Sequence, residues 1–333
     1  MKTLVTGGLG FIGSHLVELL IKEGHSVIVI DNLSTGRMQN VDSCIKNKRL
    51  KIVKADIANH KDIDKYFRGC DWVFHLAGMA DIVPSIENPL KYHNVNVGGT
   101  INVLISSISH NVKRFIYAAS SSCYGLAKKA KNTPTNEEDV IQLCHPYALT
   151  KYIGEEYALE LGQIYKLPVI SLRLFNVYGL RSRTSGAYGA VMGVFLKQKL
   201  ENKPFTIVGN GTQTRDFVYV TDVAKAFYEA AKSKRSNEIF NIGSGNSYSV
   251  NLLADLISGR KRRKIYIPKR AGEPDCTHAD ITKAETLLKW KPEISFKDGI
   301  KKITDNIECW RDAPLWDNKS IAKATKTWFR YFK

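Results

Sequence analysis

Short apolar runs alternate with longer amphipathic segments through the first half of the chain. In the first long segment, Phe11, Leu16 and Leu20 are apolar while Glu18 and Lys22 are polar, which is helical periodicity. Strands separated by such helices indicate a parallel sheet covered on both faces. The pattern therefore predicts an α/β fold with a doubly wound parallel sheet. The expected strands are residues 2–6, 26–30, 51–54, 72–76, 114–119 and 169–174, and the expected long helices are residues 11–23, 89–109 and 147–165.

The pattern changes after about residue 175. Glycine-rich loops, isolated strands and short helices replace the regular alternation, with turn signals at residues 179–186 and 209–212. Chains of 333 residues usually divide into two units. We expect residues 1–175 to form the first domain and residues 176–333 to form a smaller C-terminal substrate-binding lobe. We also expect segments of this lobe to interleave with the first domain.

Composition narrows the classes of partner. A formal net charge of +17 raises the possibility of nucleic acid or an anionic membrane surface. The basic clusters, such as residues 260–264, lack the interleaved aromatic residues of a single-strand binding groove, so we interpret them as solvated surface and expect no nucleic-acid partner. No segment approaches the ~18 uninterrupted apolar residues of a membrane span. Six scattered cysteines show neither metal-ligand spacing nor a disulfide framework, which favours a cytoplasmic protein without a metal.

Three glycines, Gly7, Gly10 and Gly13, stand between the first expected strand and the first helix. Missing side chains let the backbone approach a pyrophosphate, and a helix N-terminus directs N–H groups at it. The spacing is not the common G-x-G-x-x-G, so this turn alone is a weak signal. Asp31 strengthens it, because a carboxylate at the end of the second strand can bind ribose hydroxyls and repel the 2′-phosphate of NADP. The combination predicts a Rossmann-type NAD site, to which Asp56 could add a contact with the adenine amino group.

A second motif is typical of proton transfer. Tyr147 and Lys151 stand four residues apart in an expected helix, so both side chains project from one face. A nearby cation favours the phenolate and lowers the pKa of a tyrosine, which gives a general base. The serine-rich segment 118–125 follows the fifth strand, at the sheet edge where ligands bind. A hydroxyl there can share a hydrogen bond with the substrate oxygen that loses its proton.

These motifs, spread over residues 1–310, resemble the extended short-chain dehydrogenase/reductase family, in particular its NAD-dependent nucleotide-sugar epimerase/dehydratase branch. Matching segments also occur at residues 31–36, 75–78, 96–100, 173–179 and 215–220. The resemblance implies that Ser120 is the catalytic hydroxyl beside Tyr147 and Lys151. It implies a cofactor site made by Gly7, Gly10, Phe11, Ile12, Gly13, Asp31, Asn32, Ser34, Asp56, Ile57, Leu76, Ala77, Asn96, Tyr147 and Lys151.

The resemblance also implies a substrate site and a partner. Asn176 would touch the diphosphate, and Arg215 and Arg270 would hold the nucleotide phosphates. The complete expected set is Ser121, Ser122, Asn176, Val191, Arg215, Arg270, Glu273 and Thr277. Homodimerisation through the helices at residues 89–109 and 147–165 is typical of the family, so a homodimer is expected.

Members of this family share a first step, in which the tyrosine takes the C4 hydroxyl proton while hydride moves to NAD, giving a 4-keto sugar. Dehydratases carry an Asp-Glu pair directly after the catalytic hydroxyl, and decarboxylases carry a glutamate two residues after it. Ser121 and Ser122 stand at these positions, so no carboxylate is available there for chemistry at C5 or C6. The resemblance then implies 4-epimerisation, in which the keto sugar turns and takes the hydride back while NAD stays bound.

Other reactions stay open at this point. Asp81 could supply a carboxylate from elsewhere, for a dehydratase, decarboxylase or 4-keto reductase of the same fold. Cys123 lies one residue from the acid/base cysteine of 3,5-epimerase/reductases, and we interpret it as packing. A non-catalytic dinucleotide sensor is the alternative from another class.

Sugar identity depends on two further likenesses. Thr277 resembles the small residue of epimerases that admit an N-acetyl group, and residues 185–191 resemble the nucleotide loop of UDP-N-acetylglucosamine 4-epimerases. The expected substrates are therefore UDP-N-acetylglucosamine and UDP-N-acetylgalactosamine, or UDP-glucose and UDP-galactose.

Overall fold

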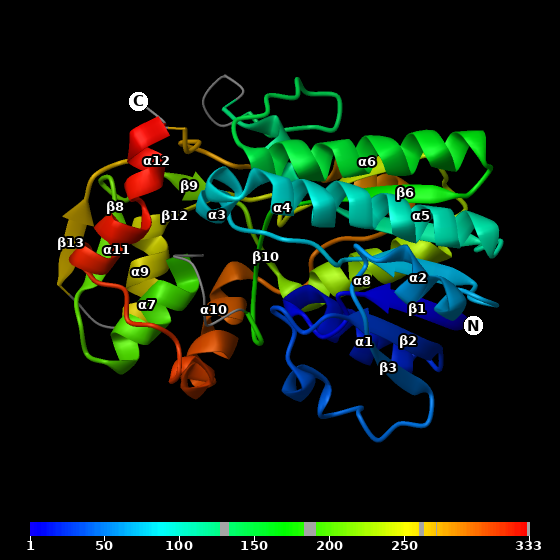
Figure 1. Ribbon diagram of the computed structural model, residues 1–333. Helices are drawn as coiled ribbons and strands as arrows, with labels where there is room; N and C mark the ends of the chain where they lie inside the picture. Colours follow the sequence, from blue (N-terminus) through cyan, green and yellow to red (C-terminus); the bar gives the residue numbers. More distant parts are fainter. Residues whose placement is uncertain (127–132, 183–190, 260–262, 271, 332–333) are drawn as a thin grey trace.

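The computed structural model describes residues 1–126, 133–182, 191–259, 263–270 and 272–331. Seven parallel strands form its central sheet, in the order β11-β6-β5-β4-β1-β2-β3 (Figure 1). Their bounds are β1 Lys2–Thr6, β2 Ser26–Asp31, β3 Leu50–Lys54, β4 Trp72–His75, β5 Arg114–Ser120, β6 Val169–Leu174 and β11 Glu238–Ile242. The six predicted strands are confirmed to within one residue at each end. Strand order reverses between β1 and β4, which places a ligand crevice at their carboxyl ends.

Helices cover both faces of this sheet. Helices α1 (Phe11–Lys22) and α8 (Val220–Lys232) pack on one face, around Phe74. Helices α5 (Gly99–Ser109) and α6 (Pro146–Ile164) lie side by side on the other face (Figure 1). Consecutive residues of β4 serve the two cores, since side chains alternate across a strand. The predicted Rossmann-type doubly wound sheet is confirmed.

The predicted helix at residues 89–109 is interrupted. The structure has α4 (Pro89–His93), a π-helical segment (Asn94–Gly98) and then α5. Within this segment Asn96 turns its side chain to Met79 and Thr150, and its carbonyl accepts a hydrogen bond from Thr100. Such π segments occur often at functional sites. Periodicity could not reveal it, because apolar positions recur on one face in either geometry.

The second half of the chain builds a smaller layer beyond the carboxyl ends of the strands and also returns to the main sheet. Its own core includes Phe195, Leu253 and Ile300. Strand β11 and helix α8 join the large sheet instead. The elements of the smaller layer are α7 (Val191–Leu200), α9 (Val250–Ser258), α10 (Phe296–Asp305), β8 (Phe205–Val208) and β13 (Lys264–Ile267).

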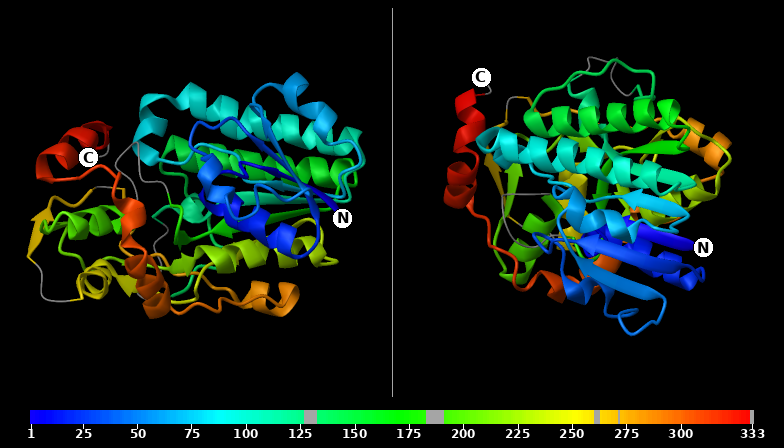
Figure 2. Two further views of the ribbon diagram at one scale, coloured as in Figure 1. Left: turned by 90° about the horizontal axis from the view of Figure 1, so that it is seen from below. Right: turned by 45° about the vertical axis from the view of Figure 1, so that its right-hand side comes forward.

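Short elements complete the described chain. Figure 2 shows the C-terminal helices, in red, on the same side as the smaller layer. None of the helices in the described ranges has the length and apolar character needed to cross a membrane. The remaining elements are α2 (His60–Ile63), α3 (Ile82–Glu87), α11 (Asn318–Ala324), α12 (Lys326–Tyr331), β7 (Asn176–Tyr178), β9 (Thr214–Arg215), β10 (Phe217–Tyr219), β12 (Tyr248–Ser249), four 3-10 turns at Met38–Val41, Asp64–Tyr66, Ser121–Tyr124 and Ile307–Trp310, and a second π segment at Ala284–Leu288.

Candidate functional site

One continuous cleft of about 2560 Å³ runs along the carboxyl ends of the strands, from the glycine turn to the smaller layer. All the predicted site residues line it except Asn96 and Lys151. The structure thus brings together side chains that are far apart in sequence, such as Asp31, Tyr147 and Thr277. The volume exceeds the ~300–1,000 Å³ of an ordinary small-molecule pocket, so there is space for two large ligands side by side.

The glycine turn forms a cradle that side chains would fill. A Cβ atom at Gly7 would lie 2.7 Å from the backbone nitrogen of Ala77, and one at Gly13 would lie 2.2 Å from the carbonyl oxygen of Gly7. Gly7 also has a φ of +69°, in the left-handed region that favours glycine. Gly10 caps helix α1 without a side-chain hydrogen bond, and no acidic residue occupies the first turn. The N–H groups of this helix end therefore suit an anion such as a pyrophosphate.

Asp31 lies beside this cradle at the end of β2. Its carboxylate accepts N–H hydrogen bonds from Leu9 (3.0 Å) and Leu33 (2.8 Å). Burial raises the pKa of Asp31, and the two N–H groups oppose the rise. A Cβ at Gly36 would stand 2.7 Å from both carboxylate oxygens, so glycine keeps this side of Asp31 open. Cradle, helix end and carboxylate together fit the pyrophosphate and ribose of NAD.

Asn96 lies behind the wall of the cleft. Its side chain is 1% exposed and accepts the N–H of Met79 (2.7 Å) while donating to the carbonyl of Met79 and to Thr150, both at 3.0 Å. Met79 itself lines the cleft. Asn96 therefore fastens the loop after β4 to helix α6.

Tyr147 and Ser120 meet in the middle of the cleft. The Ser120 hydroxyl lies close enough to Tyr147 to act on its pKa, and it donates a hydrogen bond to the hydroxyl of Ser122 (2.9 Å). Burial raises the pKa of Tyr147, the nearby Ser120 hydroxyl lowers it, and the charge of Asp81 raises it further. The expected lowering of this pKa is not met, because burial outweighs the influences that favour the phenolate.

Lys151 lies one turn further along α6 and is 7% exposed. Its Nζ stands 4.3 Å from the centre of the Tyr117 ring. Burial lowers the pKa of Lys151 to about 7, and the charge of Glu155 opposes this. The ammonium is therefore balanced between its charged and neutral forms near neutral pH. The predicted face-sharing of Tyr147 and Lys151 holds in helix α6.

The substrate end is lined by side chains from separate segments. Thr277 donates its hydroxyl proton to Asn176 (3.0 Å) and accepts the N–H of Asp216 (3.1 Å). Arg270 pairs with Glu273 at 3.1 Å, and its guanidinium lies over the ring of Trp328. Burial lowers the pKa of the half-buried Arg215, and the charge of Glu273 opposes this. Two guanidinium groups on one cleft wall suit a diphosphate.

Three further predictions from the sequence concern the cleft. Asp81 lines it with a φ of +99°. Cys123 is 2% exposed, and burial raises its pKa to about 12, in agreement with a packing role. Most of the segment 185–191 lies outside the described residues, while Val191 begins α7 at the cleft wall.

Sequence reasoning missed His145, which caps helix α6. Its Nδ1 accepts the N–H of Ala148 (3.1 Å), and its ring is nearly parallel to that of Tyr147, at 9° and 6.0 Å. Burial lowers the pKa of His145 to about 4, so it is neutral at pH 7. His145 also lines the cleft. Pro146, a favoured first residue of helices, was the available signal for a cap at the preceding position.

The chain is similar in sequence to known proteins that share one family. The NAD dependent epimerase/dehydratase family matches residues 3–243. A putative UDP-glucose 4-epimerase from Methanocaldococcus jannaschii is 41% identical, over 91% of this chain and 97% of that protein. A UDP-N-acetyl-alpha-D-glucosaminuronate decarboxylase from Bacillus cytotoxicus is 30% identical, over 90% of this chain and 96% of that protein.

A solved structure shares both fold and cofactor class. UDP-glucuronic acid 4-epimerase from Bacillus cereus, in complex with UDP-glucuronic acid and NAD, superposes with a TM-score of 0.85 at 34% identity, covering 92% of this chain and 99% of that one. The predicted family resemblance, the Rossmann-type fold and NAD as the cofactor are confirmed. The cradle from Gly7 to Gly13, the carboxylate of Asp31 and the Ser120–Tyr147 contact thus belong to a chain that is a member of the NAD-dependent epimerase/dehydratase family.

Proposed function

We propose that the protein is an NAD-dependent 4-epimerase of a UDP-sugar. The expected substrate pair is UDP-N-acetylglucosamine and UDP-N-acetylgalactosamine, or UDP-glucose and UDP-galactose. The observation that best supports this proposal is the closeness of Ser120 to Tyr147 in the cleft. Ser121 and Ser122, which follow Ser120 in the sequence, line the same cleft. Proton transfer is supported by this group of hydroxyls, whereas elimination or decarboxylation calls for a carboxylate there.

The residues that would hold NAD are those of the glycine cradle, the end of α1 and Asp31. When bound, NAD supplies reversible hydride acceptance at C4 of the sugar. The cleft beyond it is large enough for a nucleotide sugar and for the turn of a keto sugar between two orientations.

Tyr147 performs the proton transfer in this proposal. Its phenolate oxygen takes the C4 hydroxyl proton and later returns it, while Ser120 shares a hydrogen bond with the same sugar oxygen. An unperturbed tyrosine with a pKa near 10 is phenolate in only about one molecule in a thousand at pH 7, and burial makes that fraction smaller. The Lys151 ammonium on the same helix face favours the phenolate and offsets part of that cost.

The other end of the cleft would recognise the nucleotide diphosphate. Arg215 and Arg270 provide charge-assisted hydrogen bonds to phosphate oxygens, and Asn176 provides an amide. Thr277 is small, and its hydroxyl is occupied by Asn176 and the backbone of Asp216. A side chain of this size leaves room for an N-acetyl group on the sugar.

A homodimer is the proposed assembly. The outer surfaces of α5 and α6 carry exposed apolar side chains, among them Ile105 (43%), Leu149 (43%) and Tyr157 (42%). Exposed apolar side chains on two neighbouring helices are a feature of subunit contacts, which supports this assembly. Sedimentation measurements on the wild type and on Ile105→Glu should give a dimer and a monomer, and a monomeric wild type would exclude this assembly.

Asp81 favours a second candidate reaction. It lines the cleft, and its charge acts on Tyr147, so the cleft holds a carboxylate close to the proposed proton acceptor. A nucleotide-sugar dehydratase, decarboxylase or 4-keto reductase could use it. These reactions change the mass of the sugar, whereas epimerisation does not.

Product analysis tests the proposal. Purified protein is incubated with a panel of UDP-hexoses and UDP-N-acetylhexosamines, and the products are examined by mass spectrometry and NMR. The proposal expects a C4 epimer of unchanged mass without added reductant, and no product with Tyr147→Phe. A product of altered mass would favour the second candidate. NAD binding with every sugar unchanged would favour a non-catalytic dinucleotide sensor.

A further inference from the structure

Helix α6 carries a buried carboxylate that the proposed reaction does not use. Glu155 lies one helical turn after Lys151 and is 1% exposed. Carboxylates are rarely buried so completely unless they are paired, because burial removes the water that stabilises the charge. A buried carboxylate one helical turn from the proposed catalytic lysine therefore suggests a role beyond packing.

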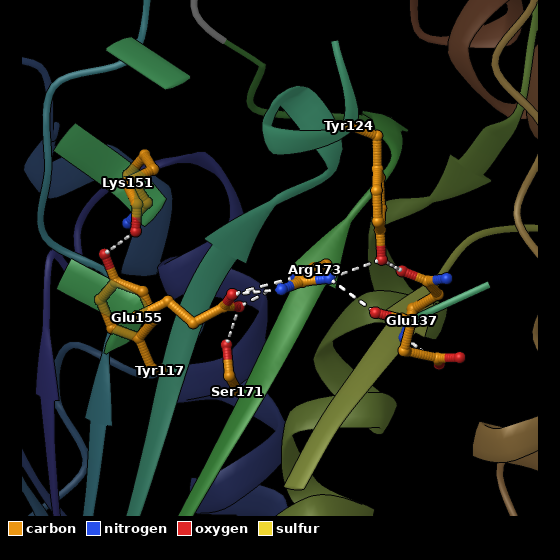
Figure 3. Close-up of polar contacts among 8 residues, drawn as sticks. Tyr117, Tyr124, Glu137, Lys151, Glu155, Ser171 and Arg173 are labelled. Carbon is orange, nitrogen blue, oxygen red and sulfur yellow. Dashed lines mark hydrogen bonds and ion pairs between the residues drawn. The ribbon is translucent and has the colours of Figure 1, made fainter. Parts of the chain in front are cut away.

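Arg173 and Ser171, both on β6, bind the Glu155 carboxylate. Arg173 donates from Nη2 to Oε1 at 2.6 Å and from Nε to Oε1 at 3.0 Å, and the Ser171 hydroxyl donates to Oε2 at 2.6 Å (Figure 3). Arg173 is itself 3% exposed. Such short, charge-assisted bonds form a buried ion pair and fix the orientation of the carboxylate.

The other side of the Arg173 guanidinium is fixed as well. Its Nη1 donates to the Tyr124 hydroxyl at 2.9 Å and to the carbonyl of Glu137 at 3.2 Å (Figure 3). The Tyr124 hydroxyl donates in turn to Asn241 on β11 at 2.7 Å. Arg173 is therefore held between helix α6 and strand β11 and cannot turn away from Glu155.

Four titratable groups face Lys151 from the elements packed around it: Tyr147 and Glu155 on α6, Tyr117 on β5 and His75 on β4. Burial raises the pKa of Tyr117, and burial together with Lys151 lowers the pKa of His75 to about 3. Both are neutral at pH 7, as is Tyr147 with its raised pKa. Of these four groups, Glu155 alone carries a negative charge near Lys151.

We propose that Glu155 is a positioning residue of the reaction, whose carboxylate, fixed by Arg173 and Ser171, keeps Lys151 charged in a place where burial favours the neutral amine. This inference depends on the proposed function for its catalytic meaning. Burial lowers the pKa of Lys151 to about 7 even with Glu155 present. Without that charge the pKa falls further, and the cation that favours the Tyr147 phenolate is lost at neutral pH.

Glu155→Gln is the direct test, because the amide retains the shape and an acceptor oxygen but not the charge. The Lys151 Nζ is titrated by NMR in protein labelled at lysine nitrogen, and Lys151→Met identifies its signal. We expect the Lys151 pKa to fall by about one unit or more in Glu155→Gln. The alkaline limb of kcat should move to lower pH by the same amount, with KM for the UDP-sugar unchanged at pH 6. An unmoved Lys151 titration would overturn the proposal.

Asp222→Asn is the matched control. Asp222 is also a fully buried carboxylate, but it lies on α8 and accepts the N–H of Ile294 at 2.9 Å. Its loss should leave the Lys151 titration unchanged even if stability falls. A shift in this control equal to that in Glu155→Gln would also overturn the proposal, since it would trace the shift to general destabilisation.

A second variant covers failure of Glu155→Gln to fold, since that change leaves Arg173 buried and unpaired. Glu155→Gln combined with Arg173→Met removes both charges, a replacement that buried ion pairs often tolerate. The Lys151 pKa should again fall, and a wild-type titration in this variant would overturn the proposal. If the wild type has no epimerase activity but the Lys151 pKa still falls in Glu155→Gln, the proposed function is rejected and the effect of Glu155 on Lys151 stands. If the wild type is an active epimerase and the Lys151 pKa is the same in Glu155→Gln, only the role of Glu155 is rejected.

Discussion

The two ends of the cleft are built in different ways. At the cofactor end, the backbone and the absence of side chains shape the site. A Cβ atom at Gly7 or Gly13 would lie only 2.7 Å or 2.2 Å from the nearest backbone atom. At the substrate end, side chains dominate, and Asn176, Arg270 and Thr277 come from separate segments joined by hydrogen bonds and ion pairs. The glycines of the cofactor end therefore cannot be replaced by larger residues without moving the backbone. The substrate end can change specificity by exchanging one side chain, which is consistent with a family whose members act on different sugars.

The largest effect is expected where the two ends meet. Tyr147→Phe removes the proposed proton acceptor and should lower kcat by about 10³-fold, while leaving affinity for NAD and for UDP unchanged. Kinetic assays and calorimetric titration measure these quantities. Tyr266→Phe, at an exposed tyrosine on β13 away from helices α5 and α6, is the control and should behave as wild type. Retention of kcat in Tyr147→Phe would remove the tyrosine from its role.

A change at the cofactor end should act on NAD alone. Gly13→Ala places a Cβ against the carbonyl oxygen of Gly7, so the turn must open, and we expect affinity for NAD to weaken by about 10- to 100-fold. UDP affinity should be preserved. Gly98→Ala is the control, because a Cβ there meets nothing within 4 Å. Equal losses of NAD and UDP affinity would contradict the separation of the two ends.

A change at the substrate end should weaken binding of the UDP-sugar and leave NAD affinity unchanged. Arg270→Ala removes a guanidinium from the proposed diphosphate site, and KM for the UDP-sugar should rise by about tenfold with NAD affinity intact. Arg311→Ala, at an exposed arginine paired with Glu308, is the control and should leave KM unchanged. If Arg270→Ala weakens NAD binding instead, the assignment of this end is wrong.

The smallest effect concerns stability at acid pH. Burial lowers the pKa of His145 from 6.5 to about 4, so the unfolded state binds this proton first as the pH falls. His145 therefore contributes to acid destabilisation between about pH 6.5 and pH 4. His145→Asn keeps a helix cap, and its Tm should fall less than that of the wild type between pH 7.5 and pH 5. Parallel Tm curves for the two proteins would show that His145 does not titrate in this way.

Much of the fold and of the cofactor end was predictable from the sequence. The strands and the α1 and α6 helices follow from periodicities of two and 3.6 residues, which reflect local backbone geometry. The glycine turn and Asp31 lie within the first 31 residues, so their spacing along the chain nearly fixes their spacing in the structure. The same holds for Tyr147 and Lys151, one helical turn apart.

Only the tertiary structure decided which distant residues meet and how deeply they are buried. Strand β11 joins the main sheet from the second half of the chain, and Asn96 stands behind the cleft wall in a π-helical segment. Arg173 shows the limit: a charge inside the apolar run 169–174 needs a partner, but the sequence does not say that the partner is Glu155. The shifted pKa values of Tyr147 and Lys151 likewise come from burial, which only the tertiary structure determines. Periodicity reports which face a residue occupies, whereas burial and charge depend on what the rest of the chain places against that face.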